Sequence, residues 1–525
     1  MRRGIKLDAL VKHLSVFGLP GNGKTTAIYY LLLQLYLRGI PFIVLETGKT
    51  EYRLLKCLKH HKDRRMRQLA RALRVYTPGS SVSPMRHNPL AERPGVSRDQ
   101  HIENLLACFK GAMPMSGPLP ALLGESLEQV YEGHVDNQPP PRMADLVAAM
   151  KRTLSSKGYS RDVDSDIRAA LEVRLGMLTR RLIGEVFQCP VDVPSIEDLA
   201  TKCSVIELAA LPQEQACLLA LFILTAIQEY VMTTPLTRAI RLVVVIEEAH
   251  NIVGCSREAA PSEENADPKA YASEFVCRML AEFRALGVGL IIVNQLPSAV
   301  APDVVKNTGS KLTFREVDNE DREILGGAML FGPIENEEVA RLRPGEAYFI
   351  TEGYFGPCRI RTPNLHADLQ LPLPPVGDAL LPYLIDDPWF AQAAAARTEA
   401  ETNLLRFEMD NFEDLRIQVM REAKALVGER LKVSGKAPQG ADRRTALAKR
   451  AQGFRNRLWL AFSVFHRDAY RRLLPNVPAS VSIGEDCQAL CHDLAERFDS
   501  VVRPGTEEVL KMLDRLVVEC RDVPP

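Results

Sequence analysis

The sequence predicts an α/β fold with a mostly parallel central sheet, a helical insertion and an α-helical C-terminal domain. Two apolar runs, Leu14–Phe17 and Leu242–Ile246, lead directly into residues that carry chemistry, as buried parallel strands do at their carboxyl ends. From residue 386 onward the chain has helical periodicity and no strand-like alternation. These patterns favour one α/β core followed by a separate helical domain.

A glycine-rich loop follows the first predicted strand and leads into an apolar helix over residues 27–37. The loop has the pattern Gly-x-x-x-x-Gly-Lys-Thr of a phosphate-binding P-loop, in the strand, loop and helix order that such a loop needs. Glycines let successive N–H groups face a triphosphate, Lys24 supplies charge to the β- and γ-phosphates, and the Thr25 hydroxyl ligates Mg²⁺. The residues expected to bind the nucleotide are Gly18, Pro20, Gly21, Asn22, Gly23, Lys24, Thr25 and Thr26.

Two adjacent glutamates, Glu247 and Glu248, end the second strand in the pattern of a Walker B motif. Hydrolysis needs one carboxylate on the metal side and one that accepts a proton from the attacking water. We assign Glu247 to Mg²⁺, through a metal-bound water because Asp is usual at this position, and Glu248 to the attacking water. We expect the P-loop and these acids to lie at adjacent strand tips.

Other polar residues stand at predicted strand tips. Gln295 ends an apolar strand over residues 288–294, where it can sense the γ-phosphate and hold the water or simply cap the strand. The turn after a strand at 40–46 holds three more candidates, which a solvated turn explains equally well: Glu46, Lys49 and Glu51. Further strands are expected at 203–208, 311–315, 346–351 and 358–361.

The 525 residues exceed one ordinary core, so several domains are expected. We predict the first part of the ATPase core at 1–116, a helical insertion at 117–195, the second part of the core at 196–365, a Pro-rich linker at 366–385 and the helical domain at 386–525. Helices are expected at 119–131, 143–154 and 167–183 in the insertion, and at 391–409, 414–431, 443–473, 486–499 and 507–520 in the C-terminal domain.

Composition fits a globular protein without strong bulk charge. Hydrophobic residues make up 46% and the formal net charge is zero, so any nucleic-acid contact must come from local patches. Eleven scattered cysteines suit reduced thiols in a cytosol, and neither a signal peptide nor a bilayer-length apolar run stands out. We therefore expect a cytoplasmic protein without a membrane partner.

Two basic stretches invite a nucleic-acid interpretation. The run over residues 56–74 can touch phosphates, although a solvated helix face is the better default. Between 416 and 472 basic residues are interleaved with aromatic ones, and helical spacing favours aromatics in a bundle core: Phe454, Trp459, Phe462 and Phe465. The stretch Val75–Leu90 reads as a loop, and Cys487, Cys491 and His492 lack the second ligand pair of a zinc site.

These motifs resemble the HerA/FtsK group of RecA-like ATPases, and more narrowly the HerA-type DNA helicase and translocase subfamily. The resemblance covers residues 14–362 and rests on the P-loop, the turn at 46–53, Glu-Glu-Ala-His at 247–250 and the segment at 287–305. It implies ATP with Mg²⁺, a hexameric ring, duplex DNA as partner, and a nuclease or other effector beside the ring; with such an effector, antiphage defence is one expected role. It also implies an arginine acting on the neighbouring subunit's ATP, with Arg315 as first choice and Arg284 as second. The small β-barrel that usually precedes the P-loop in HerA-type proteins is missing.

Three functions stay open at this stage. The first is a Mg²⁺- and ATP-dependent DNA translocase or helicase subunit. The second is an ATP-switched assembly component that regulates an effector without moving along DNA. The third, a secretion-type motor of the same superfamily, is disfavoured because no membrane segment is visible.

Overall fold

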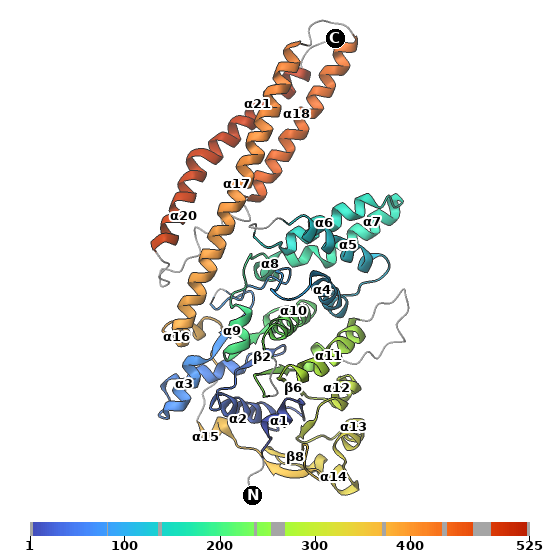
Figure 1. Ribbon diagram of the computed structural model, residues 1–525, viewed down its shortest axis with the longest axis vertical. Helices are drawn as coiled ribbons and strands as arrows, with labels where there is room; N and C mark the ends of the chain where they lie inside the picture. The colour runs from blue at the N-terminus through green and yellow to red at the C-terminus, as the bar shows by residue number, and fades with distance from the viewer. Residues whose placement is uncertain are drawn as a thin grey trace. The chain divides into compact units, whose positions relative to one another are not determined.

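The computed structural model describes residues 4–80, 82–134, 139–235, 239–253, 268–369, 374–432, 438–465 and 485–521. The chain divides into a core unit, Met1–Phe390, and a helical unit, Ala391–Pro525. The core unit holds the sheet and the helices that cover it (Figure 1).

A nine-stranded sheet forms the centre of the core unit, in the order β3-β4-β2-β5-β6-β1-β7-β8-β9. The strands from β3 to β7 along this order are parallel, whereas β8 and β9 are antiparallel. The strands are β1 (Leu14–Phe17), β2 (Phe42–Glu46), β3 (Arg74–Tyr76), β4 (Ser204–Glu207), β5 (Leu242–Glu247), β6 (Val288–Asn294), β7 (Ser310–Thr313), β8 (Glu346–Ile350) and β9 (Cys358–Arg361). The predicted α/β class with a mostly parallel sheet is confirmed.

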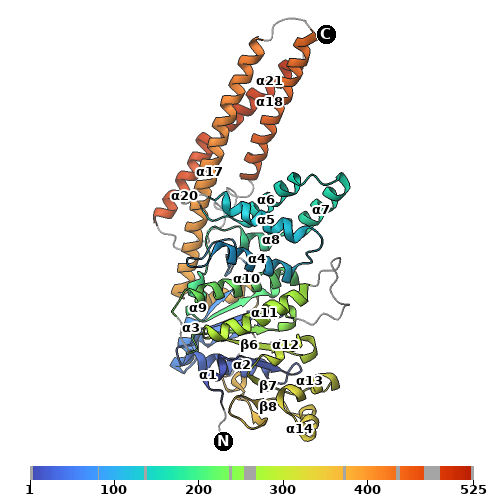
Figure 2. The same cartoon turned by 45° about the vertical axis from the view of Figure 1, so that its right-hand side comes forward.

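Helices cover both faces of the sheet, which explains why its central strands are almost wholly apolar. Figures 1 and 2 show α2 (Lys24–Tyr36) on one face and α10 (Gln213–Met232) with α4 (Arg98–Ala112) on the other. By length and composition α10 could cross a bilayer, but 83% of its apolar window is buried inside the protein. Its apolar side chains therefore pack in the hydrophobic core of the core unit.

Further helices complete the core unit. They are α1 (Leu7–Leu10), α3 (Arg64–Ala72), α9 (Ile196–Thr201), α11 (Pro268–Ala285), α12 (Pro302–Lys306), α13 (Asn319–Met329), α14 (Pro333–Glu338), α15 (Leu365–Asp368) and α16 (Leu381–Leu384). The insertion forms α5 (Leu119–Glu132), α6 (Met143–Ser156), α7 (Arg161–Arg174) and α8 (Arg181–Phe187). The expected helix over 167–183 is thus two helices, separated by a 3₁₀ turn at Gly176–Thr179.

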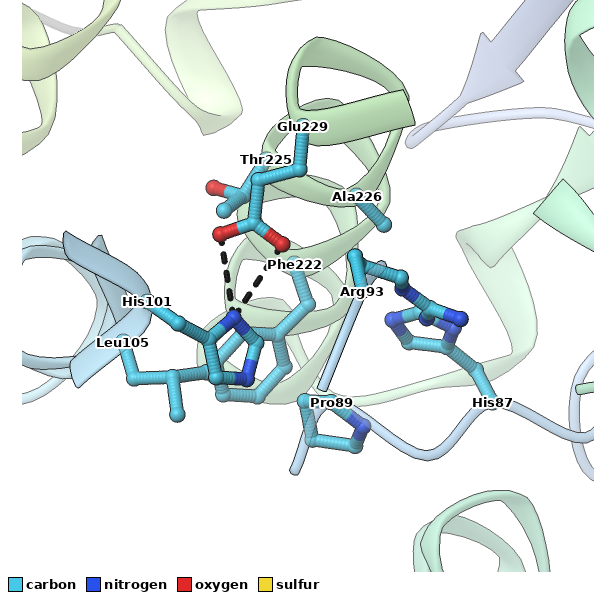
Figure 3. A pocket seen from close by; sticks show the side chains of 9 residues that line it. All are labelled: His87, Pro89, Arg93, His101, Leu105, Phe222, Thr225, Ala226 and Glu229. Atoms are coloured by element: carbon cyan, nitrogen blue, oxygen red, sulfur yellow. Dashed lines mark hydrogen bonds and ion pairs between the residues drawn. The ribbon is translucent and has the colours of Figure 1, made fainter. Parts of the chain in front are cut away.

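Two buried histidine–carboxylate pairs lie on the α10 side of the sheet, and the pair that joins α4 to α10 is drawn in Figure 3. His101 Nδ1 lies 3.0 Å from Glu229 Oε1, and His87 Nδ1 lies 3.0 Å from Asp192 Oδ1. The cavity between these groups measures about 10 Å³, which is room for one water molecule. Because Glu229 lies near the end of α10 that leads toward the start of β5, this cavity is remote from the strand tips that carry the predicted site.

Two expectations for residues 56–90 hold only in part. Of the loop expected at 75–90, Val75 and Tyr76 instead belong to the edge strand β3, which pairs with β4 and buries both side chains. The basic run is not simply a solvated face either. Lys56, on the 3₁₀ segment η1 (Tyr52–His60), is fully buried and bonds Asp387 Oδ2 at 2.5 Å and the carbonyl oxygen of Ala70 at 2.6 Å.

Residues 374–390, the last part of the core unit, pack against the rest of that unit. Asp387 also lies 3.2 Å from Lys59 Nζ, and the Trp389 ring meets Tyr76 edge to face at 5.4 Å. Within the predicted linker at 366–385, the Pro375 carbonyl oxygen accepts from Arg53 Nη1 at 2.9 Å and the Tyr383 carbonyl oxygen accepts from Lys59 Nζ at 3.3 Å, so part of this segment is anchored to η1. Its Pro-rich part lies largely outside the described residues, at 370–373.

The helical unit contains most of α17 (Pro388–Lys432), with α18 (Pro438–Val464), α20 (Glu485–Arg497), a π-helical turn at Phe498–Val502 and α21 (Arg503–Arg521). α17 is continuous where two helices were expected, because the junction at 410–413 holds neither Gly nor Pro and Phe412 is buried. Phe465 stacks on Phe412 and Phe462 on Phe498, as expected of core aromatics, whereas Trp459 is 51% exposed. No cluster of metal-ligating side chains occurs among the residues that the structure describes in either unit.

Candidate nucleotide site

The P-loop lies between the carboxyl end of β1 and the first turn of α2. Its three glycines all have positive φ: 145° at Gly18, 75° at Gly21 and 108° at Gly23. A Cβ at Gly18 would stand 2.6 Å from Phe314 Cβ, so the loop needs glycine here both for its backbone angles and for space. The loop is further fixed by Gly345 N, which donates to the carbonyl oxygen of Asn22 at 2.9 Å.

Lys24 points back into the loop. Its Nζ donates to the carbonyl oxygens of Gly18 and, at 3.3 Å, of Leu19. Burial lowers the pKa of Lys24, although the nearby Glu248 and Glu247 carboxylates act against this shift. The ammonium group thus occupies the concavity formed by the loop, where only backbone oxygens satisfy it.

Glu247, the last residue of β5, accepts a hydrogen bond from the Tyr52 hydroxyl on Oε1. Burial raises the pKa of Glu247 to about 7, and the Glu248 carboxylate adds to the shift. The Thr47 hydroxyl donates to the carbonyl oxygen of Glu247 at 2.8 Å, and Asn251 Nδ2 donates to the Thr47 hydroxyl at 3.0 Å. The turn after β2 therefore fixes the tip of the Walker B strand.

Glu248 adopts a left-handed conformation with φ 49° and ψ 53°, which is rare for a residue with a side chain. The Gln295 amide donates to its Oε1, and its Oε2 is buried without a hydrogen-bond partner among the described residues. His250 Nδ1 lies 2.7 Å from Asn294 Oδ1 and 3.5 Å from Glu248 Oε2. The strained turn thus presents a carboxylate that Gln295 holds through Oε1, with the His250 ring beside Oε2.

The expected adjacency of the two motifs is wrong in one respect. Strand β6 lies between β1 and β5, so the tip that carries Asn294 and Gln295 separates the P-loop from the two acids. All three tips belong to parallel strands and open on the same edge of the sheet. Gln295 consequently lies between the phosphate loop and the base that we assigned.

The two candidate arginines lie at opposite ends of the parallel strands, Arg315 at their carboxyl ends and Arg284 at their amino ends. Arg315 follows β7 at the P-loop edge, where its carbonyl oxygen accepts from Leu19 N at 3.0 Å and its exposed Nε donates to the Ala340 carbonyl at 3.0 Å. Arg284 is exposed in the last turn of α11, just before β6 begins. It therefore lies at the amino-terminal edge, away from the phosphate loop of its own chain.

Glu316 is a carboxyl group that the sequence analysis missed. It follows Arg315 but is fully buried, and neither oxygen has a hydrogen-bond partner among the described residues. Burial, with a contribution from Asp321, raises its pKa to about 8, while Lys24 lowers it. Its position directly after a strand could have indicated a site residue. Arg315 also follows this strand, and only Arg315 was chosen as a candidate from the sequence.

The residues gathered here fit a nucleotide with Mg²⁺. The three loop glycines have positive φ, Lys24 Nζ donates to loop carbonyl oxygens, and Glu248 Oε2 has no hydrogen bond among the described residues. Thr25, partly exposed in the first turn of α2, and Glu247 provide oxygen ligands of the kind that Mg²⁺ prefers.

Comparison with known proteins agrees with this geometry. No family model matches the chain. The DNA double-strand break repair helicase HerA of Pyrococcus furiosus is 28% identical over 124 residues, which are 23% of this chain and 20% of that protein. The chain itself has an α/β fold with a mostly parallel sheet, in which a P-loop joins β1 to α2. The similarity to HerA supports the predicted resemblance to the HerA/FtsK group, over about one fifth of the relative's length.

Two solved structures align with most of the chain at low identity. VirB4 of Thermoanaerobacter pseudethanolicus matches 69% of this chain and 91% of its own chain, with 17% identity and a TM-score of 0.48. The plasmid coupling protein TrwB, solved with ADP and Mg²⁺, matches 68% of this chain and 86% of its own, with 13% identity and a TM-score of 0.47.

Proposed function

We propose that this protein hydrolyses ATP with Mg²⁺ at the P-loop edge of its sheet and uses the energy to move along DNA. The observation that carries the proposal is the convergence of Lys24, Glu247, Glu248 and Gln295 on one edge of the parallel sheet. A binding site alone would not need a carboxylate on a strained backbone beside the phosphate loop, with one oxygen held by Gln295 and the other without a hydrogen bond among the described residues.

Each residue has a defined part in this proposal. The loop glycines and Lys24 bind the phosphates, and Thr25 and Glu247 would hold Mg²⁺, which neutralises charge on the phosphate oxygens when it is bound. Glu248 accepts the proton of the attacking water, and the Gln295 amide fixes its carboxylate and the water beside it. An arginine from a neighbouring subunit, Arg315 or Arg284, would complete the site in a homo-oligomeric ring.

The resemblance to HerA supports duplex DNA as the track, a hexamer as the assembly and a nuclease or other effector as partner. HerA itself is described as a DNA double-strand break repair helicase. A role in antiphage defence and a cytoplasmic location belong to the same proposal.

The site assignment is tested by ATP binding and steady-state hydrolysis with and without duplex DNA. We expect Lys24→Ala to lose ATP binding, and Glu248→Gln to keep binding while hydrolysis falls by ~100-fold or more. Lys306→Ala and Glu352→Gln, which change exposed side chains remote from the P-loop, are matched controls expected to behave as wild type. Normal hydrolysis by Lys24→Ala or Glu248→Gln would refute the assignment.

Movement is tested separately by displacement of a triplex-forming strand from duplex DNA, which requires directional translocation. We expect ATP-dependent displacement by wild type and none by Glu248→Gln. ATP turnover without displacement would instead favour the ATP-switched assembly component. Mass measurement with ATP and DNA gives the ring size.

A further inference from the structure

Three glutamates form a row across the tips of adjacent strands. Glu46 of β2 is in register with Glu207 of β4 on one side and with Glu247 of β5 on the other. Glu207 and Glu46 are buried, and the Glu247 side chain is largely so. Three carboxyl groups so close together repel one another when charged, so each needs its own stabilising partner.

The structure provides a different partner for each member of the row. Glu207 forms a buried two-pronged ion pair with Arg53, with Nε to Oε1 at 2.6 Å. Glu46 accepts backbone N–H groups, from Glu51 at 2.6 Å and from Tyr52 at 3.2 Å. Glu247 receives neither a cation nor a backbone donor among the described residues, but only the Tyr52 hydroxyl, on Oε1.

The Tyr52 ring is itself firmly held. It is 1% exposed and meets the Tyr29 ring edge to face, with centroids 5.1 Å apart. Its backbone N–H is bound by Glu46 and the next residue, Arg53, is bound by Glu207, so the first two members of the row fix the residue that reaches the third.

We propose that Tyr52 is the positioning residue that holds the Glu247 carboxylate with Oε1 toward the protein and Oε2 toward the metal. The inference rests on the proposed function, and it adds a residue on η1 to the nucleotide site. A neutral donor suits this place because it orients a carboxylate without removing the negative charge that attracts Mg²⁺. Partners that orient a ligand in this way typically change metal affinity or activity by about 10- to 100-fold when removed.

The test compares Tyr52→Phe with Tyr29→Phe. Both variants remove one hydroxyl from the same pair of packed rings, but the Tyr29 hydroxyl donates to the Glu51 carbonyl oxygen at 3.0 Å and does not bond Glu247. The probe is a fluorescent non-hydrolysable ATP analogue, titrated with Mg²⁺ and, separately, bound in excess EDTA. Thermal unfolding checks that both variants fold.

We expect Tyr52→Phe to need about 10-fold more Mg²⁺ for half-maximal tight binding, with unchanged affinity in EDTA. Tyr29→Phe should stay within twofold of wild type in both conditions. An unchanged Mg²⁺ requirement in Tyr52→Phe would overturn the inference, and so would an equal loss of affinity in EDTA, which indicates a structural role.

A second comparison measures the effect of Tyr52→Phe in a Glu247→Gln background, so that the result does not rest on the single variant. Glu247→Gln keeps an oxygen acceptor for the hydroxyl, and adding Tyr52→Phe to it should not weaken Mg²⁺ dependence further if the two residues act together. Additive losses would contradict the inference. Failure of the wild-type protein to bind the analogue would instead refute the proposed function, so the two failures are distinguishable.

Discussion

His13 makes the stability of the core unit depend on pH in a specific window. The residue is 2% exposed and has φ 68°. Its Nε2 donates to the Leu280 carbonyl oxygen at 2.6 Å, and its Nδ1 accepts from Leu290 N at 3.0 Å. The ring therefore joins α11 to β6 at the start of β1, and only a neutral ring can both donate and accept.

The size of the effect follows from the pKa of His13. Burial, with a small contribution from the Arg284 charge, lowers this pKa from 6.5 to about 4. A histidine with a lowered pKa stabilises the fold fully above 6.5, and this stability is lost as the pH falls from 6.5 through 4. Linkage between these two values gives a loss of about 2 kcal/mol at pH 5 and about 3 kcal/mol at pH 4.

The assay is urea unfolding at pH 7 and pH 5, followed by tryptophan fluorescence. The chain has two tryptophans, so in a Trp459→Phe background the buried Trp389 reports the core unit. His13→Asn is the matched variant, because asparagine tolerates the left-handed backbone, can accept from Leu290 N and does not titrate. Other titrating groups are common to both proteins and cancel in the comparison.

We expect the protein with His13 to lose about 2 kcal/mol more than His13→Asn between pH 7 and pH 5. Equal losses in the two proteins would show that the ring is not held neutral, and would refute the reasoning.

Three further predictions concern the fold around the site. Lys56→Met should destabilise the core unit by about 3 kcal/mol in the same urea assay, because it leaves Asp387 buried with a weaker partner set; a change below 1 kcal/mol would contradict the burial of this pair. Gly18→Ala should abolish ATP binding, measured by calorimetry, because its Cβ would lie 2.6 Å from Phe314 Cβ; retained affinity would contradict the loop geometry. Leu330→Gly should stabilise the core unit by about 1 kcal/mol, since Leu330 is 67% exposed and caps α13 with φ 59°; destabilisation would show that its side chain has a packing role.

The strands that carry motifs could be predicted because a parallel strand buried on both faces is a continuous apolar run that ends in polar residues. Leu14–Phe17, Leu242–Glu247 and Val288–Asn294 all have this form. The order of the strands could not be predicted, because the residues of β6 and its neighbours in the chain do not indicate that this strand lies between β1 and β5.

Residues that reach the site through long-range contacts were equally hard to predict. Tyr52 stands 195 residues from Glu247 in the chain, and its own surroundings only indicate a polar turn. Glu316 and Lys56 look like ordinary surface charges because burial by distant segments leaves no local pattern. For Lys56 the covering segment includes Asp387, more than 300 residues later.

The most direct test of the central claim is a crystal structure with a non-hydrolysable ATP analogue and Mn²⁺, located by its anomalous signal. We expect Mn²⁺ beside Thr25 and Glu247, and Lys24 Nζ moved from the Gly18 carbonyl to the β- and γ-phosphates. Nucleotide or metal bound away from this edge of the sheet, with Lys24 still on the loop carbonyls, would contradict the account.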